Sequence, residues 1–162
     1  MSNYSNGIEF LLSLETQGIK MGLRRTKQLL SVCNNPENHL KSIQIIGTNG
    51  KGSTASCLSS ILENKKLTVG LYTSPHLVRL NERIQINRIH ISDSYIDKFI
   101  NKYSQDIIDL SCTFFEVMTV MSLKYFTHNN VDIAILETGL GGQFDSVTAC
   151  KPMLQLFTSI SK

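Results

Sequence analysis

The sequence has little of what would indicate a disulfide-stabilised, zinc-binding or membrane protein. Its four cysteines are far apart and form no Cys-x-x-Cys pair, so we expect reduced and mostly buried thiols. They are Cys33, Cys57, Cys112 and Cys150. No apolar run is long enough to span a bilayer, and the first residues lack the basic start and apolar core of a signal peptide. The sequence therefore predicts a soluble, cytoplasmic protein with no membrane partner.

An excess of charge of one sign is also missing. Sixteen Lys and Arg residues face thirteen Asp and Glu residues, giving a formal charge of +3, and the basic residues are scattered along the chain. Nucleic-acid binding usually gathers basic residues into a patch or run, so no nucleic-acid partner is expected. Repeats and proline-rich linkers are absent as well. With 162 residues, 41% of them apolar, we expect one domain and a monomeric protein.

Apolar periodicity predicts a strand–helix–strand unit in the first half of the chain. Two short helices, residues 7–16 and 23–33, lead into it. Residues 42–46 form an apolar, β-branched run, residues 53–66 return to helical spacing, and residues 68–72 form a second run of strand length. A unit of this kind implies a parallel sheet.

The second half continues the alternation of helices and strands. Residues 83–91 alternate between apolar and polar, which predicts a small exposed hairpin outside the main sheet. The spacing then predicts two helices followed by two strands, at residues 95–108, 114–128, 131–136 and 153–157. This order is typical of a three-layer α/β fold with a mostly parallel sheet and functional loops at the strand ends. The last strand would lie at an edge of the sheet.

The segment between the first strand and the next helix has the composition of a phosphate-binding loop. Its glycines let the backbone turn sharply and bring N–H groups toward phosphate oxygens. Lys51 supplies positive charge for the β- and γ-phosphates, hydroxyls follow it for magnesium, and the helix N-terminus faces the anion. The predicted nucleotide-binding residues are Gly47, Thr48, Asn49, Gly50, Lys51, Gly52, Ser53 and Thr54.

This loop departs twice from the general pattern G-x-x-x-x-G-K-[ST]. Ile45 occupies the first glycine position, and Gly52 intervenes between Lys51 and Ser53. A glycine-rich turn without a ligand is the alternative, but the strand before the loop, the helix after it and the lysine disfavour that interpretation. The sequence therefore predicts a divergent loop that binds ATP with Mg²⁺.

The loop resembles that of the Mur-ligase superfamily, and its Lys-Gly-Ser form resembles the folylpolyglutamate synthase and dihydrofolate synthase branch. Other segments similar to that branch are Met21–Arg24, Thr73–Ile84, Thr113–Glu116 and Glu137–Asp145. The resemblance begins near Gly18 and covers only the first half of what a family member contains. It implies that residues 1–162 are the N-terminal part of a Mur-ligase-like ATP-binding domain, truncated and without the C-terminal glutamate-ligase domain.

The family resemblance implies an ATP-dependent amide ligase. The γ-phosphate passes to a carboxylate of dihydropteroate or a folate, and the amine of L-glutamate attacks the resulting acyl phosphate. By resemblance, Ser74 and Glu137 are the magnesium ligands, and both follow predicted strands, where open α/β sheets bind ligands. A carboxylate after an apolar strand is costly unless exposed or paired, which supports the role of Glu137. The alternative for Ser74 is a simple turn residue before proline.

The resemblance also implies contacts with the pterin substrate. The candidates are Gly22, Pro75, His76, Arg83, Thr113, Phe114, Phe115, Glu116, Phe144, Asp145 and Ser146. Alternatives stay open, because His76 can be a packing residue and residues 113–116 can be a helix cap followed by core aromatics. Gln143 stands where the family has arginine, which removes a fixed positive charge and leaves the substrate preference open.

Two other functions remain as alternatives. The chain can be a nucleotide-binding module that lacks the remaining catalytic parts, and we expect the 162 residues alone to be inactive as a ligase. The other alternative is a different Mur-type ligase that acts on a peptidoglycan precursor. The Ser-Pro-His-Leu loop and the Lys-Gly-Ser form of the phosphate loop disfavour it.

Overall fold

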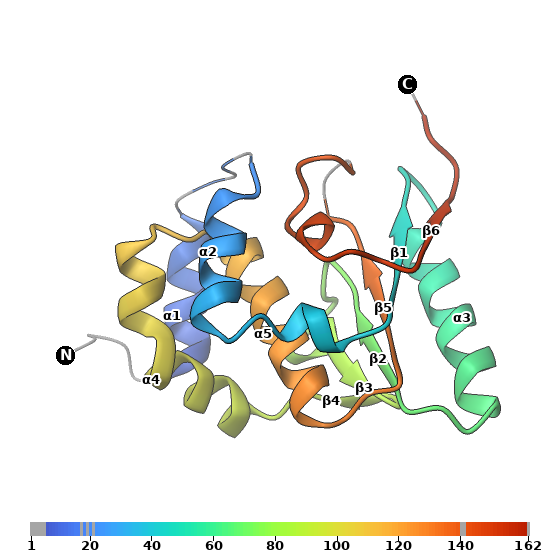
Figure 1. Cartoon of the computed structure of the whole chain (residues 1–162), viewed down its shortest axis with the longest axis horizontal. Coiled ribbons are helices and arrows are strands. Elements are labelled where there is room, and N and C mark those ends of the chain that lie inside the picture. The colour runs from blue at the N-terminus through green and yellow to red at the C-terminus, as the bar shows by residue number, and fades with distance from the viewer. Residues whose placement is uncertain (1–5, 17, 19, 21, 140–141, 162) are drawn as a thin grey trace.

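The fold was analysed in a computed structural model that describes residues 6–16, 18, 20, 22–139 and 142–161. Figure 1 shows three layers, with one helix, α3, on one side of a central sheet and α5 on the other side. Three more helices, α1, α2 and α4, lie outside α5 and form an additional helical group. The predicted three-layer α/β fold is confirmed.

Six strands form one mixed sheet in the order β4-β3-β2-β5-β1-β6. The strands are β1 (Ser42–Ile46), β2 (Val69–Tyr72), β3 (Ile84–Ile86), β4 (Ile89–His90), β5 (Ile133–Glu137) and β6 (Leu154–Phe157). The four strands from β2 to β6 in this order are parallel, whereas the β3–β4 hairpin is antiparallel. The mostly parallel sheet is therefore as predicted, and β6 lies at its edge.

The predicted position of the hairpin is wrong. We expected residues 83–91 outside the main sheet, but β3 pairs with β2, with Tyr72 opposite Ile84, and extends the sheet. The alternating isoleucines have one buried face, since Ile84 is fully buried whereas Ile89 is 72% exposed. The turn residues Asn87 and Arg88 both have positive φ, as a two-residue hairpin turn requires. Alternation alone does not distinguish a free hairpin from an edge hairpin.

The helices lie close to the predicted ranges. They are α1 (Gly7–Glu15), α2 (Arg24–Val32), α3 (Lys51–Asn64), α4 (Asp93–Asp109) and α5 (Phe114–His128), with short 3-10 turns at Pro36–His39, Leu80–Arg83 and Ser146–Ala149. The Ser92 side chain accepts a hydrogen bond from the Tyr95 amide and so caps α4. Among the described residues, no helix is long and apolar enough to cross a membrane.

The central strands β1, β2 and β5 are buried on both faces of the sheet. A large apolar cluster fills the space between the sheet, α5 and the outer helices, and a smaller one lies between the sheet and α3. Helix α5 is buried almost all round, as expected for a helix enclosed by other elements. It approaches β2 so closely that a Cβ on Gly70 would lie 2.8 Å from the Phe126 ring. All four cysteines are free, and only Cys57 is exposed, as predicted.

Candidate functional site

The glycine-rich loop lies between the carboxyl end of β1 and the start of α3, as predicted for a phosphate loop. Gly50 has a φ of 80° and caps α3 without a side-chain hydrogen bond. Gly47 also has positive φ, and a side chain there would collide with Thr158 Oγ1. Gly50 has no side chain that could accept hydrogen bonds from the first amides of α3. Amides left without such an acceptor favour the binding of an anion at a helix N-terminus.

Lys51 lies over this loop. Its Nζ donates hydrogen bonds to the carbonyl oxygens of Gly47, at 2.8 Å, and Thr48, at 3.2 Å. Gly52 follows it, and a Cβ on Gly52 would lie 3.7 and 3.8 Å from the two Glu137 oxygens. The unusual glycine after the lysine thus keeps the space between the loop and this carboxylate open. The Lys51 ammonium group, the first amides of α3 and the Glu137 carboxylate therefore lie together at the carboxyl ends of β1 and β5.

Glu137 and Ser74, the predicted metal ligands, are neighbours. Glu137 is the last residue of β5, Ser74 lies shortly after β2, and these two strands are paired in parallel. Glu137 Oε2 accepts a hydrogen bond from the Ser74 amide at 3.1 Å. Glu137 is 4% exposed. Burial raises the pKa of its carboxyl group, while the Ser74 amide and the positive charge of Lys51 partly offset that rise.

These two residues supply oxygen donors of the kind that Mg²⁺ prefers. Within the described residues, no group of three or more His, Cys, Asp or Glu side chains could hold a metal ion. A magnesium site here would therefore use one carboxylate and one hydroxyl, with water and phosphate oxygens completing the shell, as is common for this ion. A buried carboxylate with raised pKa is the observation that fits a cation at this position.

The loop after β5 lies between the predicted metal ligands and several of the substrate candidates. The Gly139 amide donates to Asp145 Oδ2 at 2.7 Å. A Cβ on Gly139 would lie 3.6 Å from both Ser74 Oγ and Asp145 Oδ2, and 3.9 Å from the Phe115 ring. Asp145 Oδ1 also accepts from the Val147 amide and so caps the turn that follows. Asp145 and Phe115 therefore lie beside the predicted metal ligand Ser74.

Arg83 is a buried cation at the same end of the sheet. Its Nε donates to His76 Nδ1 at 2.8 Å, and its guanidinium carbon lies 5.0 Å from the centroid of the Phe114 ring and 5.8 Å from that of Phe115. Arg83 is 5% exposed, and its Nη1 has no hydrogen-bond partner in the part of the chain that the structure describes. A buried guanidinium with a spare donor is costly without a ligand.

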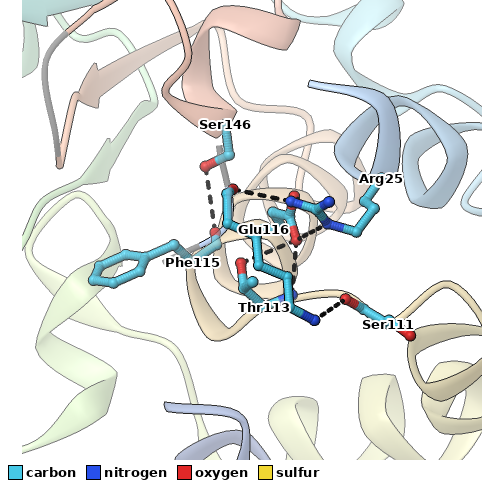
Figure 2. A network of polar contacts seen from close by, with 7 residues as sticks. Arg25, Ser111, Thr113, Phe115, Glu116 and Ser146 are labelled. Atoms are coloured by element: carbon cyan, nitrogen blue, oxygen red, sulfur yellow. Dashed lines mark hydrogen bonds and ion pairs between the residues drawn. The ribbon is translucent and has the colours of Figure 1, made fainter. Parts of the chain in front are cut away.

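Thr113 and Glu116 form a capping box at the start of α5. Glu116 Oε2 accepts from the Thr113 amide at 2.7 Å and from the Thr113 hydroxyl at 2.9 Å. Figure 2 shows that Arg25, from α2, reaches the same carboxylate. The structure thus shows the helix cap that was one of the two interpretations of this segment. Contact with a substrate stays a prediction for Glu116.

The other substrate candidates are placed less closely. Ser146 Oγ is hydrogen-bonded to Thr119 Oγ1 and donates to the Phe115 carbonyl at 3.4 Å, which ties its turn to α5. Phe144 and Pro75 are exposed. Gly22 precedes α2 and has a φ of 109°. No contact between Gly22 and the other candidates is recorded among the described residues.

Two contributors to this edge were missed by sequence reasoning. The Ser159 carbonyl, beyond β6, accepts from the amides of Thr48, at 2.8 Å, and Asn49, at 3.4 Å, and so supports the phosphate loop. No signal in the sequence marks Ser159. Arg25, in contrast, had a signal. The segment Met21–Arg24 was compared with a Gly-Leu-x-Arg segment of the family, and Gly22–Arg25 fits that pattern with Arg25 as its arginine.

Comparisons with known proteins agree with this geometry. No family model matches the chain. The dihydrofolate synthase/folylpolyglutamate synthase of Bacillus subtilis is 41% identical over 150 residues, which are 88% of this chain and 35% of that protein. The crystal structure of folylpolyglutamate synthase from Thermotoga maritima matches with a TM-score of 0.89 and 38% identity, over 96% of this chain and 38% of that one.

A bifunctional folylpolyglutamate synthase/dihydrofolate synthase crystallised with Mn, AMPPNP and L-glutamate matches with a TM-score of 0.89 and 33% identity. This match covers 98% of the present chain and 39% of the crystallised one. The chain thus spans well under half the length of these relatives. Its six-stranded sheet matches the Mur-ligase ATP-binding domain of these enzymes. In sequence and in fold, the chain belongs to the folylpolyglutamate synthase/dihydrofolate synthase family.

Proposed function

We propose that this chain binds ATP and Mg²⁺ and forms the nucleotide-binding part of a ligase that joins L-glutamate to dihydropteroate or to folates through an acyl phosphate. The observation that carries the proposal is the position of Glu137, a buried carboxylate between Ser74 and the start of α3. The names and bound ligands of the relatives support it. Because the chain spans 35% to 39% of these relatives, the whole reaction is proposed for the protein of which these residues form part.

On the nucleotide side, the chain supplies positive charge and fixed donors. The amides at the start of α3 and Lys51 Nζ would hold the phosphates, with Ser53 and Thr54 following in the first turn. Ser74 Oγ and the Glu137 carboxylate would hold Mg²⁺, which supplies charge neutralisation when two anions approach. These groups act by positioning and electrostatics, which carry most of phosphoryl transfer.

On the substrate side, the chain offers an aromatic wall and a buried cation. Phe115 is partly exposed and lies beside Gly139, so its face is available for a flat pterin or benzoyl ring. The free Nη1 of Arg83 is a donor for an anionic or carbonyl oxygen. Glu116 Oε1 forms an ion pair with Arg25 Nε at 3.0 Å but makes no hydrogen bond within the described part of the chain, which leaves it an acceptor for a ring N–H group.

A nucleotide-binding module without ligase activity is the second candidate. It requires only the phosphate loop and the carboxylate of Glu137. Both candidates share the nucleotide site and differ in product formation. Incubation with dihydropteroate, L-glutamate, ATP and Mg²⁺, followed by chromatography of the folate products, separates them, since only a ligase forms a product with an added glutamate.

The nucleotide site is tested by calorimetric titration with AMPPNP and Mg²⁺. Lys51→Ala should weaken binding about 10- to 100-fold, the loss expected for a charge-assisted hydrogen bond, with little loss of folding. In a complete enzyme that contains this segment, the same change should abolish turnover. Lys65→Ala, at the opposite end of α3, is the matched control and should bind normally. Equal affinities for wild type and Lys51→Ala would overturn the assignment of the loop.

A further inference from the structure

We infer that Arg25 is a positioning residue that holds three separate parts of the proposed substrate side in place, with Glu116 as its partner. The inference rests on the proposed function for what the pocket binds. The arrangement itself stands on contacts of the chain. Figure 2 shows Arg25 directed toward Glu116 at the start of α5, with Thr113 below Glu116 and Ser146 above Phe115.

The first part held by Arg25 is the connection between α1 and α2. Arg25 Nη2 donates to the Lys20 carbonyl at 2.9 Å, and Lys20 Nζ donates to the Ser111 carbonyl at 3.3 Å. Gly18 and Gly22, in the same connection, both have positive φ. Glycine has more accessible backbone conformations than other residues, so the bonds made by Lys20, which lies between these two glycines, fix its position against Ser111 and Arg25.

The second part is the start of α5. Arg25 Nε lies 3.0 and 3.1 Å from the two oxygens of Glu116, and the side chains are 17% and 4% exposed, respectively. Glu116 in turn accepts both hydrogen bonds from Thr113. Phe114 and Phe115 come directly after Thr113, so the orientation of the first turn of α5 also sets the aromatic wall.

The third part is the turn that carries Asp145. Ser146 Oγ donates to the carbonyl of Phe115, on the first turn of α5, and Asp145 bonds the Gly139 amide. One chain of contacts therefore links Lys20, residues 113–116 and residues 145–146. Within the described residues, none of the recorded hydrogen bonds or ion pairs of Arg25 or Glu116 involves residues 47–54. Arg25 should consequently affect the substrate side and not the nucleotide side.

The guanidinium is specifically required by this geometry. One nitrogen of Arg25 bonds the carboxylate while another bonds the backbone, which the single ammonium of a lysine cannot reproduce in the same directions. Removing one partner of a mostly buried pair also leaves the other charge uncompensated. Arg25→Gln should therefore loosen all three parts, and the effect of Arg25→Lys should lie between those of wild type and Arg25→Gln.

The test compares Arg25→Gln, Arg25→Lys and the control Arg24→Gln, whose side chain is on the same helix turn but exposed. Hydrogen exchange is measured for the amides of residues 20–25 and Thr113. Binding is measured with 7,8-dihydropteroate and, separately, with AMPPNP and Mg²⁺. For Arg25→Gln we expect exchange at these amides to be about tenfold faster and dihydropteroate affinity about tenfold weaker, the order of effect of a partly buried pair. AMPPNP affinity should stay within about twofold of wild type, because the contacts of Arg25 do not reach the loop.

Each result decides the inference. Unchanged exchange in Arg25→Gln would overturn it, and so would equal losses of nucleotide and dihydropteroate affinity, which indicate general destabilisation. An effect of Arg24→Gln as large as that of Arg25→Gln would also overturn it. If wild type fails to bind dihydropteroate while Arg25→Gln still speeds exchange at Thr113, the proposed substrate is wrong and the positioning role stands.

Discussion

The two sides of the candidate site are built in different ways. The proposed phosphate contacts of the nucleotide side come from one continuous segment, residues 47–54, which offers glycine backbone and one lysine. The substrate side is assembled from side chains of α2, α5 and two loops that are far apart in the sequence. A site made of one continuous loop can be recognised in the sequence, whereas a site made of distant residues depends on how the chain packs. The following predictions separate the two sides, from the largest expected effect to the smallest.

Gly47→Ala should disrupt the nucleotide side most. The added methyl group would collide with Thr158 Oγ1, and Gly47 has a positive φ of 154°. We expect a loss of roughly 2–4 kcal/mol in the free energy of unfolding and no measurable AMPPNP binding. Urea unfolding and calorimetry measure the two effects. Adding Thr158→Ala removes the colliding oxygen and should recover part of the stability; no recovery would show that strain at Gly47 dominates.

Glu137→Gln should abolish metal-dependent nucleotide binding while stabilising the protein without ligands. Because burial raises the pKa of Glu137, the folded state holds a proton that the unfolded state has lost, so this group lowers stability as the pH rises above its normal pKa. The neutral amide avoids that penalty. Thermal unfolding at pH 5 and pH 8 should therefore show a larger gain for the variant at pH 8. A loss of stability at pH 8 would contradict the prediction.

Arg83→Met should weaken dihydropteroate binding about tenfold and leave AMPPNP binding unchanged. The variant removes the spare Nη1 donor and the bond to His76, but it keeps apolar contact with Phe114. Parallel titrations with the two ligands measure the difference. Arg79→Met is the matched control, because Arg79 is exposed and contacts Asp93 at the surface. A fall in nucleotide affinity alone would assign Arg83 to the other side of the site.

Gln44→Leu should have a smaller effect, shared by both sides. Gln44 is fully buried in β1, accepts from Gln155 Nε2 and donates to Thr148 Oγ1, which bonds the Gly142 carbonyl. Loss of these bonds should cost about 1–2 kcal/mol in unfolding free energy. Urea unfolding with Gln155→Leu and the double variant tests the coupling. Strictly additive losses would show that Gln44 does not link β6 to the loop.

The sequence predicted the strands and the helix around the phosphate loop almost completely, whereas it predicted the contacts on the substrate side only in outline. Periodicity and the glycine-rich loop located β1, α3 and β5, because local spacing decides these elements. The hairpin at residues 84–90 was misplaced, since alternation does not reveal which strand it pairs with. The Arg25–Glu116 pair joins residues 91 positions apart, and no local pattern predicts such a contact. The roles of the nucleotide, metal and substrate candidates remain predictions.

The support of the phosphate loop by Ser159 has a consequence for the exposed edge of the sheet. The segment after β6 is bonded to Thr48 and Asn49, and β6 itself exposes Leu154 and Phe157. Ligand binding at the loop is therefore thermodynamically linked to the pairing of β6 with β1, since a ligand stabilises every contact that its bound state requires. A nucleotide would therefore serve this chain as a folding ligand, and its concentration would set how often an aggregation-prone strand is released.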